Sequence, residues 1–309
     1  MSEELIYHYT SAEGLKGIIN EQAIHCTNCL FLNDLKEYFL VVHLLKNNFN
    51  AVCIDEDTSL CLKASLTRLL DMTETLFIGL KEYSAAYISS FSSKGDLLSQ
   101  WRGYCPNGGY SLGFSKKILE KSARNQQFKM KVVEYVSDHD KPASLINSLS
   151  EFFKRFKKEI PALTYDPTHY NIRSSGLRAL LPLIPPEGKT IEEVKKEAHK
   201  IRLLEKKFGL VLHFTLMDLM PFYKDQTFKE EEEIRVASIS NETLYFKCSG
   251  NLLKPYRRLE FEQDALKEII IGPTSNIEQC ELGVNLFLQS QNIGNVTVKR
   301  SEIPYRSSH

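Results

Sequence analysis

The stretch LIYHYTSAEGLKGII (residues 5–19) passes directly from a strand pattern to a helix pattern. Side chains alternate between two faces over residues 5–9, which is the two-residue period of a strand. Thr10 and Glu13 then stand three residues apart, as in a capping box, and apolar residues follow at helical spacing. We therefore predict a strand with His8 at its end, followed at once by a helix.

Similar patterns along the chain occur in the order strands, helices, strands. They predict further strands at 85–93, 110–114, 128–136, 234–240, 243–248, 252–261, 268–271 and 295–299, and helices from Asp34, over 58–80, at 96–102, within 140–222 and after Ser275. This order favours an α+β fold over a doubly wound α/β fold. We expect a single domain over residues 1–309, with a mainly helical insertion at about residues 140–222.

The composition is that of an ordinary globular protein, with 39 basic and 39 acidic residues and 42% hydrophobic residues. A balanced chain has no bulk field that attracts nucleic acid or a membrane surface. The chain contains neither G-x-G-x-x-G nor G-x-x-x-x-G-K-[ST], which excludes those two nucleotide-binding motifs. The N-terminus has no signal-peptide pattern, and no apolar run approaches the roughly 18 residues of a bilayer span. We expect a cytoplasmic protein that does not associate with membranes.

Cysteine and histidine spacing gives no strong metal signal. The seven Cys have no framework spacing, and Cys26 and Cys29 form a single C-x-x-C without a second pair. We expect inert thiols and no metal site. The Lys-rich faces of the helical region are interleaved with Glu, which favours a solvated surface over an RNA site.

His8, Tyr9 and Thr10 stand where the first strand meets the N-terminus of the first helix. Free backbone N–H groups at a helix N-terminus favour anions, so a phosphate-bearing ligand could lie beside the imidazole. The alternative is that His8 packs within the strand and Thr10 only caps the helix. Spacing alone favours this alternative.

Ser90 and Ser92 are expected on one face of a strand, away from Phe91. Two aligned hydroxyls can orient another side chain or a sugar. Tyr104, which follows soon after, could stack on a planar ligand ring. A Ser-rich sheet edge with no ligand explains the same residues equally well.

The run KEEEEIR (residues 229–235) leads into a strand. The apolar residues of that strand alternate with Glu231, Glu233 and Arg235, which we therefore expect side by side on the opposite face. Arg235 would hold one carboxylate ionised. Paired carboxylates suit chemistry in which positive charge develops on a sugar carbon, as in glycosidic cleavage. A solvated turn is the alternative, and the pattern favours neither.

Several short motifs together resemble a bacterial family of unknown function. They are HYTS (8–11), the Leu-Asn-Asp step (32–34), SFS (90–92) with W-x-x-Y (101–104), E-x-E-x-R (231–235) and S-x-x-P-Y-R (301–306). The same order also resembles the ADP-ribosyltransferase superfamily, whose members carry a His or Arg on the first strand, a Ser-x-Ser strand and a catalytic Glu often within E-x-E. That resemblance implies a split β-sheet core, and NAD as a substrate without a metal.

The resemblance also implies roles for the residues that contact NAD. His8 would hold the adenosine-side ribose, with Tyr9 and Thr10 nearby. Tyr104 or Tyr110 would stack on the nicotinamide.

The remaining roles concern the carboxylates. Ser90, with Ser92 on the same face, would brace the catalytic Glu, and Arg235 would lie beside it. Glu233 would be that catalytic Glu and would bind the 2′-OH of the nicotinamide ribose, while Glu231 would orient the acceptor. The chain joins a first-strand His to an E-x-E motif that usually accompanies Arg. The choice between Glu231 and Glu233 therefore stays open.

The implied activity is cleavage of the nicotinamide–ribose bond of NAD and transfer of ADP-ribose to a macromolecular acceptor, either protein or nucleic acid. A toxin or a phage-defence effector would use such a transferase activity. The alternatives are an NAD glycohydrolase and a non-catalytic module that binds a nucleotide or a partner on the same fold. The enzyme hypothesis requires His8, Ser90 and Glu233 to line one pocket, and we expect Glu233 in an open cleft.

Overall fold

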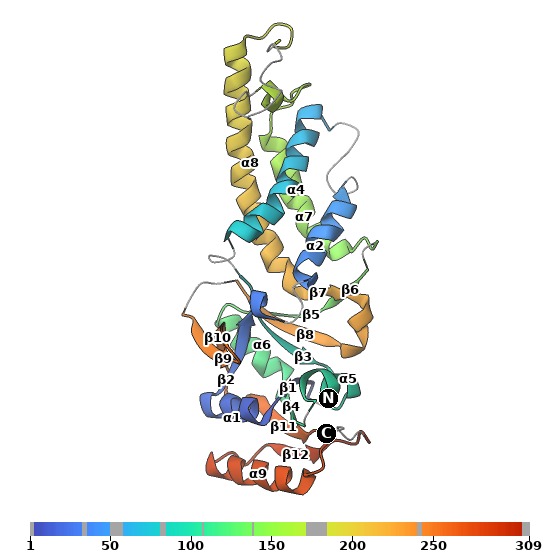
Figure 1. Cartoon of the computed structure of the whole chain (residues 1–309), viewed down its shortest axis with the longest axis vertical. Coiled ribbons are helices and arrows are strands. Elements are labelled where there is room, and N and C mark those ends of the chain that lie inside the picture. The colour runs from blue at the N-terminus through green and yellow to red at the C-terminus, as the bar shows by residue number, and fades with distance from the viewer. Residues whose placement is uncertain are drawn as a thin grey trace. The chain divides into compact units, whose positions relative to one another are not determined.

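The computed structural model describes residues 3–32, 36–49, 58–80, 85–106, 108–137, 139–170, 184–239 and 243–304. The chain forms two compact units, whose elements are labelled in Figure 1. The sheet unit consists of Met1–Tyr38, Ala85–Val136 and Pro221–His309, and the helical unit of Phe39–Ser84 and Ser137–Met220. None of the helices in the described ranges combines the length and hydropathy of a bilayer span.

The sheet unit is built on a mostly antiparallel sheet, which has ten strands in the described part of the chain. They are β1 (Leu5–Thr10), β2 (Ala23–Asn28), β3 (Tyr87–Ser92), β4 (Tyr110–Ser115), β5 (Lys129–Val132), β8 (Glu233–Ser238), β9 (Tyr245–Ser249), β10 (Leu252–Glu260), β11 (Leu266–Ile271) and β12 (Thr297–Arg300). Their order is β12-β11-β4-β1-β3-β2-β10-β9, and β8, with β5 beyond it, also pairs with β3. Two short strands, β6 (Glu134–Val136) and β7 (Tyr223–Asp225), pair in parallel apart from this sheet.

The sheet divides at β3. This strand pairs with β1 only through Tyr7 and Ser92, and with β2 only through two residue pairs. Its long partner is β8, with register pairs that run from Tyr87–Ser238 to Ser92–Glu233. Residues of β1, β2 and β8 therefore meet around one strand, although they are far apart in the sequence.

Apolar faces of the helices pack on the sheet. The helices of the sheet unit are α1 (Ala12–Glu21), α5 (Leu98–Tyr104), α6 (Lys116–Asn125) and α9 (Ile277–Ser290). Leu15 of α1, Leu119 of α6 and Val284 of α9 lie in one buried cluster with the inner face of the sheet. Trp101 of α5 belongs to a second cluster, where Tyr9 lies edge-on to the indole with 4.7 Å between ring centroids.

The helical unit has its own core. Its helices are α2 (Lys36–Asn47), α4 (Leu60–Leu80), α7 (Ala143–Glu159) and α8 (Ile191–Leu219). Phe156 of α7 packs edge-on against Phe208 of α8, with 4.8 Å between ring centroids. Arg68 of α4 bridges two buried carboxylates, those of Asp166 and Glu205, each at 2.8 Å.

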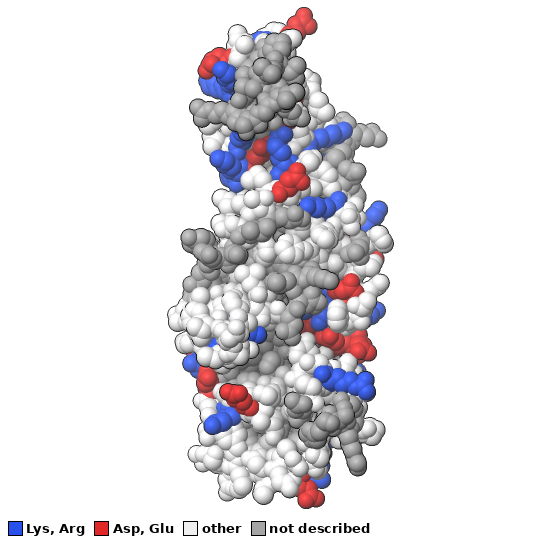
Figure 2. All heavy atoms as spheres, in the orientation of Figure 1, with Lys and Arg blue, Asp and Glu red and all other residues white. Residues whose placement is uncertain are grey.

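Basic and acidic side chains lie close together on the face drawn in Figure 2. Within the helical unit, Lys207 of α8 contacts Glu159 of α7 at 3.1 Å, and Arg155 contacts the same carboxylate. Such pairing is typical of a solvated surface.

The predicted α+β class is confirmed. Two predicted caps are wrong. Thr10 still pairs with Tyr110 in the sheet, so the strand extends through it and Ser11 caps α1 by accepting from the Gly14 N–H. Asn276, and not Ser275, precedes α9, and its side chain makes no capping bond.

Two further differences concern element boundaries. The strand predicted over 128–136 is divided into β5 and β6, which pair with different partners. Helix α6 was not predicted. It follows β4 directly, and no side chain caps its first turn, so the usual start signal is missing.

The helical unit contains two segments of the chain. The insertion predicted at about residues 140–222 corresponds to Ser137–Met220, and Phe39–Ser84 is the other segment. The predicted helix start at Asp34 lies outside the described residues, and so does Asn33 beside it. The last two residues of the S-x-x-P-Y-R motif (305–306) also lie outside them. One domain over residues 1–309 stays a prediction.

Candidate functional site

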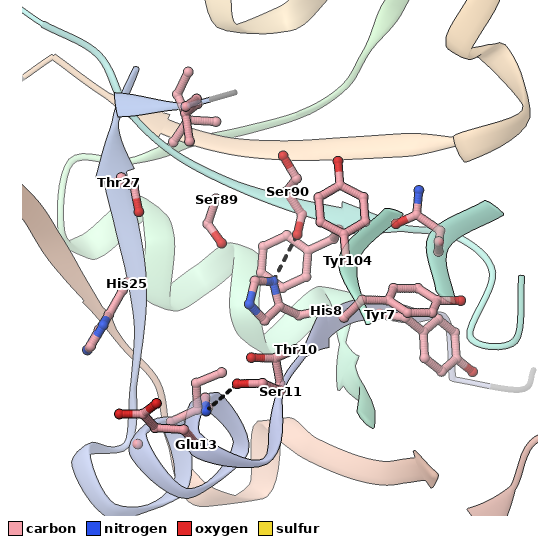
Figure 3. Close-up of a pocket in the computed structure, with 18 of the residues that line it drawn as sticks. Tyr7, His8, Thr10, Ser11, Glu13, His25, Thr27, Ser89, Ser90 and Tyr104 are labelled. Carbon is pink, nitrogen blue, oxygen red and sulfur yellow. Dashed lines mark hydrogen bonds between the residues drawn. The ribbon is translucent and has the colours of Figure 1, made fainter. Parts of the chain in front are cut away.

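A cavity of about 520 Å³ lies beside the point where the sheet divides, within the sheet unit. Its volume is typical of small-molecule sites. The predicted site residues that line it are His8, Tyr9, Thr10, Ser90, Tyr104, Glu231 and Glu233. Figure 3 shows the side chains from β1, β2, β3 and the start of α1 around this cavity. Ser92, Tyr110 and Arg235 do not line it.

His8 reaches the cavity from near the end of β1. Its Nδ1 lies 2.9 Å from the carbonyl oxygen of Ser90, as the dashed line in Figure 3 shows. A carbonyl oxygen only accepts, so Nδ1 carries the proton and Nε2 keeps a lone pair. Burial lowers the pKa of His8, so the ring is neutral at pH 7. Such a ring can accept a hydrogen bond from a ligand hydroxyl.

Glu233 begins β8 and is only 2% exposed. Its Oε1 accepts from Nε of Arg235 at 2.7 Å, and its Oε2 accepts from Nη2 of Arg235 and Nζ of Lys224, both at 3.0 Å. Burial raises the pKa of this carboxyl, but the charges and hydrogen bonds of its cationic partners lower it overall. The carboxylate is therefore ionised and tightly held. The expectation of an open cleft around Glu233 is wrong, because two cations hold it below the surface.

Glu231 does not share a strand with Glu233. It ends a short 3-10 helix (Gln226–Glu231), and Glu232 turns the chain through the left-handed region with φ of 43°. The two carboxylates nevertheless meet, because Lys224 Nζ contacts Oε2 of Glu231 at 2.9 Å as well as Oε2 of Glu233. The two predicted carboxylates therefore lie close together. They are joined by the ammonium group of Lys224, however, and do not share a strand face.

Lys224 was missed by the sequence analysis. It lies in β7, a three-residue strand, and is only 4% exposed. The sequence offers one weak signal, a single Lys within a short aromatic segment. Its contacts depend on the pairing of β7 with β6, which no local pattern reveals.

The two serines of β3 have different surroundings. Ser90 lines the cavity, and its hydrogen bond to Glu233 helps to lower the pKa of that carboxyl. Ser92 is buried, and its Oγ donates to the backbone oxygen of Glu231 at 2.7 Å and accepts from the Lys94 N–H at 3.1 Å. Ser92 therefore fixes the segment that carries Glu231.

The two candidate stacking residues also differ. Tyr104 lies at the end of α5, is 49% exposed and lines the cavity. Tyr110 lies in the main core cluster of the sheet unit. Tyr104 is thus the one of the two that a ligand in the cavity can reach.

A second cavity, of about 570 Å³, adjoins the first. Both are lined by Thr27, Leu32, Ser90, Tyr104, Glu231, Lys247 and Cys248. The second cavity adds several cationic residues, namely Lys224, Arg235 and Lys254. Lys247 and Lys254 were also missed, because they stand in an ordinary strand pattern with no motif around them.

The cysteines within the described ranges are free thiols. Burial raises the pKa of Cys26 to about 12 and that of Cys29 to about 11, so neither is a thiolate at neutral pH. In the same ranges, no group of three or more His, Cys, Asp or Glu is arranged to hold a metal ion.

Comparison with known proteins finds a similarity to a family over part of the chain. Residues 100–236 match a family model described as "Protein of unknown function (DUF2971)". The matched range includes Glu231 and Glu233, whereas His8 and Ser90 precede it. A comparison with curated proteins finds no match, and neither does a comparison with solved structures. Similarity to a family of unknown function is therefore confirmed for this range, and that family carries no assigned activity.

Proposed function

We propose that the chain cleaves the nicotinamide–ribose bond of NAD in this cavity and transfers ADP-ribose to a macromolecular acceptor. One observation carries the proposal: His8, Ser90, Glu231 and Glu233 come from distant parts of the chain and line one cavity. Their order and residue types resemble those of the ADP-ribosyltransferase superfamily, in which E-x-E usually accompanies a first-strand Arg instead of His. The division of the sheet beside the cavity also supports a split-sheet fold of that kind.

Two residues suit the binding of NAD. The neutral His8 ring presents an acceptor at Nε2, which fits a ribose hydroxyl. The half-exposed Tyr104 ring fits stacking against the planar nicotinamide. Bound in this way, the nicotinamide ribose would lie near the carboxylates.

The hydrogen bonds of the two carboxylates suggest different roles for them. A carboxylate offers about four acceptor positions. Those of Glu233 are taken by two bonds from Arg235, one from Lys224 and one from Ser90. Glu231, among the described side chains, accepts only from Lys224. We therefore propose that Glu231 contacts the ribose 2′-OH and that Glu233 holds Lys224 in position.

This assignment gives Glu231 the contact with the 2′-OH, which the resemblance alone implies for Glu233. In the reaction, positive charge develops on the ribose as nicotinamide leaves, and a fixed anion at Glu231 would stabilise it. Removal of one such preorganised partner typically costs about a hundred- to a thousandfold in rate. Lys224 and Glu233 would act by holding that anion in place.

The test is nicotinamide release from NAD by the purified full chain, with and without a cell lysate as acceptor. Release that labels lysate components with ADP-ribose is the expected result. Release without labelling would instead identify an NAD glycohydrolase. No release under either condition would refute the proposed enzyme.

A second candidate function is a nucleotide-binding module without catalysis. The observation that favours it is the complete pairing of Glu233, which leaves one carboxylate unavailable to a substrate. Such a module would show a higher melting temperature with NAD but no nicotinamide release.

A further inference from the structure

Lys247 and Lys254 face each other across the hairpin of β9 and β10, where they are direct register partners. Like charges at opposite positions destabilise an antiparallel pair. In the described part of the chain, no carboxylate forms an ion pair with either ammonium, and Lys247 instead lies over the Tyr256 ring at 5.8 Å. A bound anion would compensate the charges of these two ammonium groups.

The two lysines lie at the cavities. Both line the second cavity, and Lys247 also lines the first, so it stands where the two adjoin. Thr27 and Ser249 line the second cavity as well, and they offer hydroxyl donors. An anion beside Lys247 would thus remain close to a ligand held at His8.

The N-terminus of α1 is a less suitable place for the same anion. There the Oγ of Ser11 already accepts from the Gly14 N–H at 3.2 Å. Glu13, in the first turn, brings a carboxylate to the cavity wall, as Figure 3 shows. A bound phosphate would be repelled by that carboxylate. Glu231 also lines the second cavity, but its carboxylate is paired with Lys224, and the two lysines would attract a phosphate there.

We propose that Lys247 and Lys254 form a phosphate-binding subsite, and that this subsite takes the pyrophosphate of NAD. The first statement depends only on the charges and the cavity, whereas the second rests on the proposed function. Ammonium groups bind phosphate oxygens as compact point charges with several donors. Bound pyrophosphate would also remove the repulsion between the two strands.

The experiment measures the binding of inorganic pyrophosphate, NAD and nicotinamide riboside to the full chain by calorimetry. The variants are Lys247→Gln and Lys254→Gln, and the control is Lys267→Gln, a lysine of β11 that lines neither cavity. We expect each cavity variant to bind pyrophosphate and NAD at least about tenfold more weakly. Affinity for nicotinamide riboside, which lacks the pyrophosphate, should be unchanged.

Melting temperatures check that the variants fold. Without ligand, Lys247→Gln should melt no lower than the unmodified chain, because the substitution removes a repulsion. Pyrophosphate binding that is absent, or equal in all variants, would overturn the subsite even if NAD is cleaved. Lysine-dependent pyrophosphate binding without any NAD binding or cleavage would support the subsite and refute the proposed function.

Discussion

Lys224 contacts two carboxylates at once, and among the described side chains it forms with Arg235 a largely buried cluster of two cations and two anions. Each of these four side chains is bonded to at least one of opposite charge, so each depends on the others. Removal of one partner from a buried ion pair leaves an uncompensated charge and typically costs about 3–5 kcal/mol. The fold therefore depends on an intact set of partners at the candidate site, which the sequence pattern did not indicate.

Glu233→Gln should lower the free energy of unfolding by several kcal/mol, because Arg235 and Lys224 lose the shared anion. Glu231→Gln should cost less, since Glu231 is half-buried and its carboxylate, among the described side chains, is bonded only to Lys224. Chemical denaturation of the two variants measures the difference. Equal stability of Glu233→Gln and the unmodified chain would show that the cluster is not a structural unit.

The stability of the protein should fall in mild acid. Burial lowers the pKa of His8 and of His213 in the folded state, while the unfolded value stays at about 6.5. Below pH 6.5 the unfolded chain therefore binds more protons, and the free energy of unfolding declines as the pH falls further.

Denaturation midpoints from pH 8 to pH 5 measure this decline. In His8→Gln, the denaturation midpoint should fall less steeply toward acid pH than in the unmodified chain. His139→Gln, at an exposed position, is the control and should leave the profile unchanged. An equal fall of the midpoint in His8→Gln and in the unmodified chain would contradict the neutral state assigned to His8.

Elements with a clear start signal could be predicted from sequence. Thr190 and Glu193 predicted the start of α8, and the structure contains both bonds of that capping box. Helix α6 lacks such a signal, because Ser115 ends β4 and makes no capping bond to the helix. Periodicity and caps therefore account for most of the strands and helices, and an uncapped junction accounts for the missed helix α6. Two strands, β2 and β7, were missed as well.

The candidate site was predictable only in part. His8 and Ser90 follow from strand alternation, which is local. Glu231 and Glu233 are joined through Lys224, which lies in a separate short strand pair, and their placement also depends on the left-handed turn at Glu232. Those features follow from tertiary pairing and have no signature within a sequence window.

The end of β1 should tolerate no side chain at Gly109. A Cβ there would lie 2.6 Å from the backbone oxygen of Thr10 and 2.7 Å from Sγ of Cys105. Gly109→Ala should therefore displace the end of β1, lower the melting temperature and weaken NAD binding. The matched control is Gly283→Ala in α9, where an added Cβ meets no atom within 4 Å.

The Gly283→Ala control should raise the free energy of unfolding by up to about 1 kcal/mol, because Ala is a better helix former than Gly. Thermal denaturation compares the two variants. Unchanged stability in Gly109→Ala would contradict the close approach at the end of β1.

At the scale of the whole molecule, we expect the two units to have separate tasks. Every residue that lines either cavity belongs to the sheet unit. The helical unit has an independent core and its own buried ion cluster around Arg68. Neither cavity includes a residue of the helical unit, so we expect NAD to be recognised within the sheet unit.

Arg68→Met tests this separation. The substitution leaves Asp166 and Glu205 buried without their cation, so hydrogen exchange in α4 and α8 should accelerate. NAD affinity should stay within about twofold of the unmodified chain, because neither cavity includes these residues. Arg155→Met, which removes an exposed ion pair, is the control and should change neither quantity. A large loss of NAD affinity in Arg68→Met would contradict the separation.

The most direct test of the central claim is the rate of nicotinamide release from NAD by the unmodified chain, Glu231→Gln and the exposed control Glu230→Gln. We predict release by the unmodified chain and the control, and a rate about a hundred- to a thousandfold lower in Glu231→Gln. Folded protein that releases no nicotinamide, or a Glu231→Gln variant as fast as the control, would contradict the assignment of this cavity as an NAD-cleaving site.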